Sequence, residues 1–93
     1  MKWTNLNLPK GCFHRVRGKS QLVEVPDSGK CFYHPTKCIR DEGDGIKSVS
    51  IPEDMVIELI PKEKAMSGNF GRSDIFFINA LKFIEDQIQF KAE

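Results

Sequence analysis

The sequence predicts an α+β protein, a small curled antiparallel sheet of five or six short strands with one C-terminal helix packed on it. Residues 1–60 contain short apolar or alternating runs, and the turns between them are too short for the crossovers that parallel strands require. Only residues 73–90 keep a helical spacing of apolar side chains over a long stretch. We therefore expect one domain (1–93) with a strand-rich part at 1–60, a loop at 61–72 and a helix at 73–90.

Four of the expected strands lie in the first half of the chain. In the first of them, Trp3, Leu6 and Leu8 are expected to be covered by other parts of the protein. The second alternates between two faces, and the turn after it has the length of a hairpin connection. The expected strands are residues 3–8, 12–17, 21–25 and 31–34.

The second half of the chain supplies the rest of the sheet. A short segment at 37–40 and an acidic, glycine-rich turn at 41–45 precede a strand expected at 46–51. Residues 55–60 are almost wholly apolar, so we expect a central strand that is covered on both faces.

The expected C-terminal helix has one clear apolar face. Advancing each residue by 100° gathers five apolar side chains within an arc of roughly 100°. Ser73 is a suitable N-cap, and Asp74 would then lie favourably against the positive end of the helix dipole. The side chains expected to face the sheet are Phe77, Ala80, Leu81, Ile84 and Ile88.

A second aromatic stripe runs beside this face, because Phe76, Phe83 and Phe90 recur every seven residues. A contiguous exposed aromatic surface is typical of an interface, most simply with the same helix of a second copy. We therefore predict a homodimer with these three side chains as anchors. The alternative is that a wide sheet or a folded-over loop covers them.

The charge of the chain is distributed unevenly, although the formal net charge is only +1. Residues 1–40 carry eight Lys and Arg against two acidic side chains, whereas residues 41–93 carry six against eleven. The basic half can therefore attract the acidic half or leave a basic patch exposed.

Arg15, Arg17 and Lys19 form the main candidate for contact with nucleic acid. On a regular strand Phe13 would share a face with both arginines, which combines cations with a stacking surface. The alternative is a solvated hairpin whose charges keep an edge strand from pairing with other chains.

Three cysteines and two histidines are the candidates for metal binding or nucleophilic chemistry. Zinc prefers thiolate and imidazole ligands in a tetrahedral arrangement, but the two Cys/His pairs differ in spacing and the second would straddle a regular strand. Zinc binding is therefore only a second alternative, with Cys12, His14, Cys31, His34 and Cys38 as its ligands. No third group that would orient a cysteine nucleophile is evident, so we expect no enzyme activity and no cofactor.

These patterns favour a non-catalytic binding module that self-associates through its C-terminal helix, with a nucleic-acid-binding accessory protein as the alternative. The odd number of cysteines and the lack of a signal-like apolar run favour reduced thiols and a cytoplasmic location. No stretch approaches the ~20 apolar residues that span a membrane. The compact chain fits a small accessory protein of a mobile element.

Overall fold

A computed structural model describes residues 2–84 and confirms the α+β class. It contains eight strands in two sheets, slightly more than predicted, and a helix that begins at Ala80. The strands are β1 (Trp3–Pro9), β2 (Phe13–Arg17), β3 (Ser20–Val25), β4 (Lys30–Pro35), β5 (Ile39–Gly43), β6 (Ile46–Pro52), β7 (Val56–Pro61) and β8 (Phe76–Asn79). The short helical segments are η1 (Lys10–Cys12), η2 (Thr36–Cys38), α1 (Lys62–Ser67) and η3 (Arg72–Asp74).

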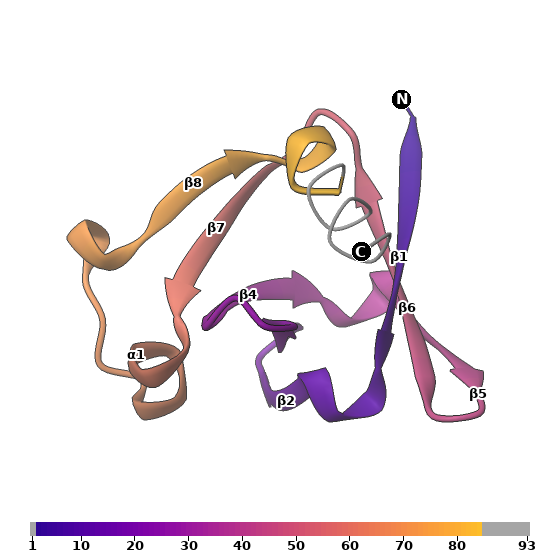
Figure 1. The fold of residues 1–93 in the computed structure, drawn as a ribbon, viewed down its shortest axis with the longest axis horizontal. Coiled ribbons are helices and arrows are strands. Elements are labelled where there is room, and N and C mark those ends of the chain that lie inside the picture. Colours follow the sequence, from indigo (N-terminus) through magenta and orange to yellow (C-terminus); the bar gives the residue numbers. More distant parts are fainter. Residues whose placement is uncertain (1, 85–93) are drawn as a thin grey trace.

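The two sheets have the strand orders β1-β6-β5 and β2-β3-β4-β7-β8, and all pairings are antiparallel, as the short turns predict. The chain crosses between the sheets at η1, which leads from β1 to β2, at η2, which leads from β4 to β5, and at residues 53–55, which lead from β6 to β7. In Figure 1 the β7–β8 pair and the β1–β6 pair form two sides of the molecule, and the start of the C-terminal helix lies near their upper ends.

The main hydrophobic core lies between the two sheets. Alternate residues of β1 and β6 face alternate residues of β3, β4 and β7, and the start of the C-terminal helix completes the cluster. Its fully or almost fully buried members are Leu6, Leu8, Cys12, Val23, Val25, Phe32, Val49, Ile51, Ile57, Leu59, Ala80, Phe83 and Ile84.

A smaller cluster covers the other face of the five-stranded sheet, where Leu22, Cys31 and Ile60 pack against Ala65 of α1. Residues 61–72 are therefore not simply a loop, because α1 occupies the first half of that segment. Gly68 ends α1 in the left-handed conformation, with φ of +75°.

The prediction of a helix over residues 73–90 is wrong for its first part. Ser73 lies in η3 rather than at the cap of a long helix, and β8 follows directly as a partner of β7. In this pairing Phe77 lies opposite Glu58 and Phe76 lies opposite Leu59. Residues 76–79 form a strand because they can pair with the edge of β7. The main-chain hydrogen bonds of this pairing favour the strand more than the helical spacing of the side chains favours a helix.

The predicted core stripe of the helix is accordingly only partly buried. Ala80 and Ile84 lie in the core as expected, whereas Phe77 and Leu81 are exposed. The remaining member, Ile88, lies outside the described residues. The stripe was calculated for a helix that in fact starts seven residues later, so Phe77 follows the alternation of a strand instead.

The apolar run at 55–60 forms β7, an interior strand between β4 and β8, as the sequence predicts. However, β7 is not covered on both faces along its whole length, because Val56 is 55% exposed on the outer face. Within residues 2–84, β7 is joined to β4 by only two register pairs, Lys30 with Pro61 and Cys31 with Ile60. No helix of this part of the chain is long and apolar enough to cross a membrane.

Candidate nucleic-acid interface

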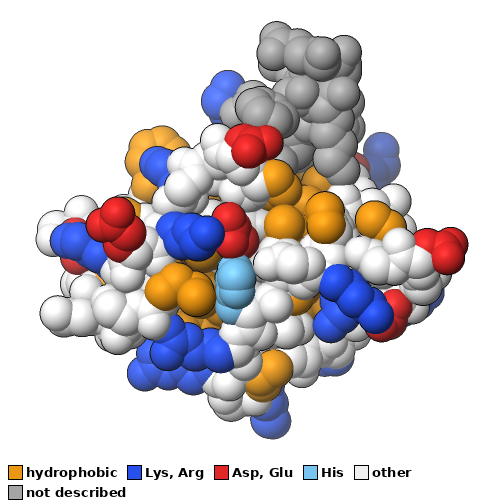
Figure 2. Space-filling view, turned by 60° about the horizontal axis from the view of Figure 1, so that its bottom comes forward, with side chains coloured by type: hydrophobic (Ala, Val, Ile, Leu, Met, Phe, Trp, Pro, Cys, Tyr) orange, Lys and Arg blue, Asp and Glu red, His pale blue; other side chains and the backbone are white. Residues whose placement is uncertain are grey.

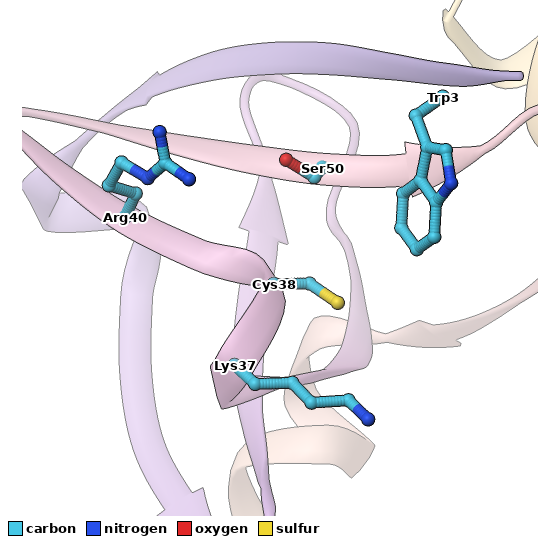
Figure 3. Close-up of a pocket in the computed structure, with 5 residues that line it drawn as sticks. All are labelled: Trp3, Lys37, Cys38, Arg40 and Ser50. Atoms are coloured by element: carbon cyan, nitrogen blue, oxygen red, sulfur yellow. The ribbon is translucent and has the colours of Figure 1, made fainter.

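A pocket of about 260 Å³ lies on the outer face of the three-stranded sheet (Figure 3). Each strand of that sheet supplies one side chain to its lining, Trp3 from β1, Ser50 from β6 and Arg40 from β5. The segment η2 adds Lys37 and Cys38. In Figure 3 the Trp3 ring extends from β1 across the strand that carries Ser50, toward the side on which Cys38 lies, and Arg40 stands further along β5.

The alternation of β6 explains why Ser50 faces outward. Its neighbours Val49 and Ile51 are completely buried in the core, so the side chain between them points to the opposite face of the sheet. Its hydroxyl donates a hydrogen bond of 2.8 Å to the side-chain oxygen of Asn5, the register partner on β1. This contact holds polar groups of two strands together beside the pocket.

The Trp3 side chain is exposed rather than covered, against the expectation from the sequence. It is 52% accessible, because it lies on the outer face of β1 opposite Pro52, at the end of the β1–β6 ladder. Leu6 and Leu8 on the same strand are buried as expected. An indole held on a sheet face in this way offers a flat surface for stacking.

The floor of the pocket is supported from inside the protein by His34. Its Nε2 donates a hydrogen bond of 2.8 Å to the main-chain carbonyl of Ser50, which connects β4 to the other sheet. His34 is almost completely buried, and its Nδ1 has no hydrogen-bond partner among residues 2–84. Burial lowers the pKa of His34, although the bond to the carbonyl acts in the opposite direction. The ring is therefore neutral at pH 7.

The basic side chains near the pocket are not neutralised by acidic neighbours. Among the described residues, Lys10 is the only lysine or arginine of the first forty residues that forms an ion pair, with Asp41 at 3.3 Å. Lys37 and Arg40 have no ion-pair partner in that part of the chain, and no described acidic residue lines the pocket. The face in Figure 2 differs, since there basic side chains stand beside acidic ones at several places.

A second pocket, of about 220 Å³, adjoins the first because Lys37 lines both. Its other lining residues are Lys19, Pro35 and Thr36. The main-chain nitrogen and the hydroxyl of Thr36 both donate to the carbonyl of Lys19, at 2.9 and 3.3 Å. These bonds fix the β2–β3 turn against η2, so Lys19 belongs to the same basic surface.

The basic ribbon predicted from the sequence is divided by the fold. Lys19 joins the second pocket, whereas Arg15 donates to the carbonyls of Ala65 and Met66 at the end of α1. Arg17 is exposed at the end of β2. Phe13 does not share a face with the two arginines, because a register shift interrupts β2 and Phe13 packs against the main core.

The five residues of the zinc alternative do not converge. Cys12 lies in the core between the sheets, whereas Cys31 lies in the smaller cluster on the other face of the five-stranded sheet. His34 is engaged with Ser50, and Cys38 lies at the first pocket. Among residues 2–84, no group of three or more His, Cys, Asp or Glu side chains has an arrangement that could hold a metal ion.

The remaining histidine, His14, belongs to a structural ion-pair cluster. Its Nε2 lies 2.8 Å from one carboxylate oxygen of Glu24, and Lys62 Nζ lies 3.1 Å from the other. The hydrogen bond from His14 is the main reason that the pKa of Glu24 is lowered, with Lys62 acting in the same direction. The cluster connects β2 and β3 to the start of α1.

The three phenylalanines predicted as interface anchors do not form one helical stripe. Phe76 is 54% exposed on β8, with Lys30 Nζ 4.6 Å from its ring centre. Phe83 is buried in the core and meets Phe32 edge to face, with ring centres 5.5 Å apart. Phe90 lies outside the described residues. Phe77, the next residue of β8, is also exposed, at 55%, but on the opposite face of the strand.

Sequence reasoning missed most of the first pocket. Trp3 and Ser50 come together only through the pairing of β1 with β6, which joins segments more than forty residues apart. The excess of basic residues in the first forty was the one available signal, and it includes Lys37 and Arg40. No protein-family model, curated protein or solved structure shows significant similarity to this chain.

Proposed function

We propose that this chain is a non-enzymatic binding module that holds nucleic acid on the outer face of its three-stranded sheet. The observation that carries the proposal is the pocket that places Trp3 beside Lys37 and Arg40 with no described acidic residue in its lining. Cations bind the phosphate backbone, and an exposed aromatic ring gives bases or sugars a surface for packing.

The chemistry of the cysteines and histidines supports a role without catalysis. A cysteine nucleophile acts as the thiolate, but burial raises the pKa of Cys31 to about 11, which keeps it protonated at neutral pH. His34 is buried and engaged with a carbonyl, and His14 is held by Glu24. Neither histidine is therefore placed to activate Cys31 as a general base.

The cytoplasmic location and the role as an accessory protein of a mobile element belong to the same proposal. All three cysteines are free thiols in this structure, which is consistent with a reducing compartment. A small module that binds nucleic acid also suits an element whose own genome must be copied or packaged.

The test is the binding of a short labelled single strand and of the matching duplex, followed by fluorescence anisotropy between roughly 50 and 200 mM salt. We expect binding that weakens with salt, and a loss of about tenfold or more in the double variant Lys37→Gln, Arg40→Gln. Lys64→Gln is the matched control, because Lys64 is exposed but paired with Asp74 at 2.6 Å. No binding at low salt, or an equal loss in the control, would overturn the proposal.

A second candidate function, self-association, is favoured by β8, the last strand of its sheet, which exposes the aromatic side chains of Phe76 and Phe77. A strand at the edge of a sheet offers unpaired main-chain groups to the same strand of a second copy. Sedimentation of the wild type and of Phe77→Gln tests this candidate. A dimer that becomes a folded monomer in the variant supports it, and a wild type that is monomeric at high concentration rejects it.

A further inference from the structure

We infer that the ligand of this surface is a single strand, bound at two adjacent nucleotide subsites that share Lys37. This inference rests on the proposed function and makes it more specific. The first subsite is the pocket that Trp3, Arg40 and Ser50 line with Lys37, and the second is the pocket that Lys19 and its neighbours line with Lys37.

The exposed indole is the reason for a single strand. In a duplex each base is already stacked on both faces and paired at its edge, so its flat surface is not available to a protein side chain. Trp3 is half-exposed on the broad face of a sheet rather than at the tip of a loop, which does not give it the shape of a wedge between base pairs. An unpaired base stacks on such a surface without opening a helix.

The two subsites are contiguous and uniformly basic. Lys37 reaches both pockets, Arg40 lines the first and Lys19 lines the second. None of the described residues that line either pocket is acidic. We assign the phosphate between two successive nucleotides to Lys37, the base of one nucleotide to Trp3, and the neighbouring phosphate to Lys19.

The backbone of the second subsite is held in place by hydrogen bonds, so the subsite does not depend on the lysine side chains alone. The two bonds from Thr36 to the carbonyl of Lys19 hold the β2–β3 turn beside η2. The ring of Pro35 forms another part of the lining, and its rigid apolar surface suits a sugar or a base. A ligand therefore pays little ordering cost for the backbone at this position.

Trp3 makes the inference directly measurable, because it is the only tryptophan of the chain. Quenching of the tryptophan fluorescence, excited selectively, then reports contact at the first subsite. The probes are oligo(dT) strands from a dinucleotide upward, a duplex of matched length, and inorganic polyphosphate as a polyanion without bases. We expect saturable quenching by the single strands, and none by the duplex or by polyphosphate.

Two variants separate the subsites, with anisotropy as the readout of affinity. Trp3→Ala is expected to weaken binding of every single strand by about 10- to 100-fold. Lys19→Gln is expected to weaken the longer strands and to lower their salt slope by about 0.7. It is expected not to affect a dinucleoside monophosphate, because the single phosphate of that probe is assigned to Lys37 and not to Lys19. Arg17→Gln is the matched control, because this exposed basic side chain two residues away lines neither pocket.

The outcomes distinguish this inference from the proposed function. Salt-sensitive binding of the duplex without quenching would overturn the single-strand inference and leave the proposed function standing. Absence of binding to every probe would overturn both. Single-strand quenching with equal effects of Lys19→Gln and Arg17→Gln would overturn the second subsite, whereas the full expected pattern supports the inference as stated.

Discussion

His34 of β4 is joined to Ser50 of β6 by a hydrogen bond of 2.8 Å from the ring Nε2 to the main-chain carbonyl. This bond crosses from one sheet to the other through the core, and Ser50 presents its opposite side to the candidate nucleic-acid interface. The packing of the core and the shape of the pocket are therefore connected through one residue.

The protonation of His34 is expected to make the protein less stable in mild acid. The folded state lowers the pKa of His34 below its ordinary value of 6.5, so below that pH the unfolded chain binds more protons than the folded chain. The free energy of unfolding then rises with pH, and falls as pH drops from about 6.5 towards the folded pKa. Urea denaturation at pH values between 7.5 and 5 measures this dependence.

His34→Gln provides the control for the pH dependence. A glutamine amide keeps a donor for the Ser50 carbonyl but does not titrate in this range. We expect a nearly flat stability between pH 7 and 5.5 in this variant. A pH dependence as steep as that of the wild type would show that other groups cause it.

Phe83 is expected to act in the core and not at an interface. It is 3% exposed and packs edge to face on Phe32, so Phe83→Ala should lower the free energy of unfolding by about 3–5 kcal/mol. Leu81→Ala, at an exposed position of the same helical turn, should cost less than about 1 kcal/mol. Both values come from urea denaturation followed by circular dichroism.

The milder change Phe83→Leu keeps this prediction testable if Phe83→Ala does not fold. It should still lower stability by more than Leu81→Ala does. A Phe83 variant that is as stable as the wild type, but changes the number of subunits, would instead support the interface assigned to Phe83 from the sequence.

The end of α1 allows a clean comparison between two glycines. Gly68 has φ of +75°, and a side chain there costs about 1 kcal/mol even though a Cβ would meet no atom within 4 Å. Gly71 is equally open but has an ordinary φ of −118°. We expect Gly68→Ala to lower the thermal midpoint and Gly71→Ala to leave it unchanged or raise it slightly. Equal midpoints for the two variants would contradict this account.

Local patterns predicted the strands well wherever turns bounded them. The strands expected at 12–17 and 46–51 appear in the structure as β2 and β6, because β-forming residues and flanking turns are local properties, but a register shift breaks the alternation predicted for β2. Residues 76–79 were assigned to a helix because four apolar or neutral residues fit either period. Their pairing with β7 depends on a distant strand, which no local pattern contains.

The candidate interface was predictable only in its charge. The excess of basic residues in the first forty predicted a cationic surface, and Lys19 lines a pocket together with Lys37. The arrangement of the strands in two sheets determines which other basic side chains lie near Lys19 and where Trp3 lies. That arrangement follows from the pairing of β1 with β6, which lie far apart in the sequence, so local spacing does not reveal it.

The two register pairs between β4 and β7 have a consequence for how the molecule opens. A five-stranded sheet joined at its middle by so short a ladder divides there more easily than elsewhere. Amide hydrogens of β7 and β8 should therefore exchange with solvent through a partial opening of the protein. Those of β3 and β4 should exchange more slowly, because their exchange requires unfolding of the whole protein. We therefore expect the antiparallel pair of β7 and β8 to open separately, while the three-stranded sheet that carries Trp3 stays folded.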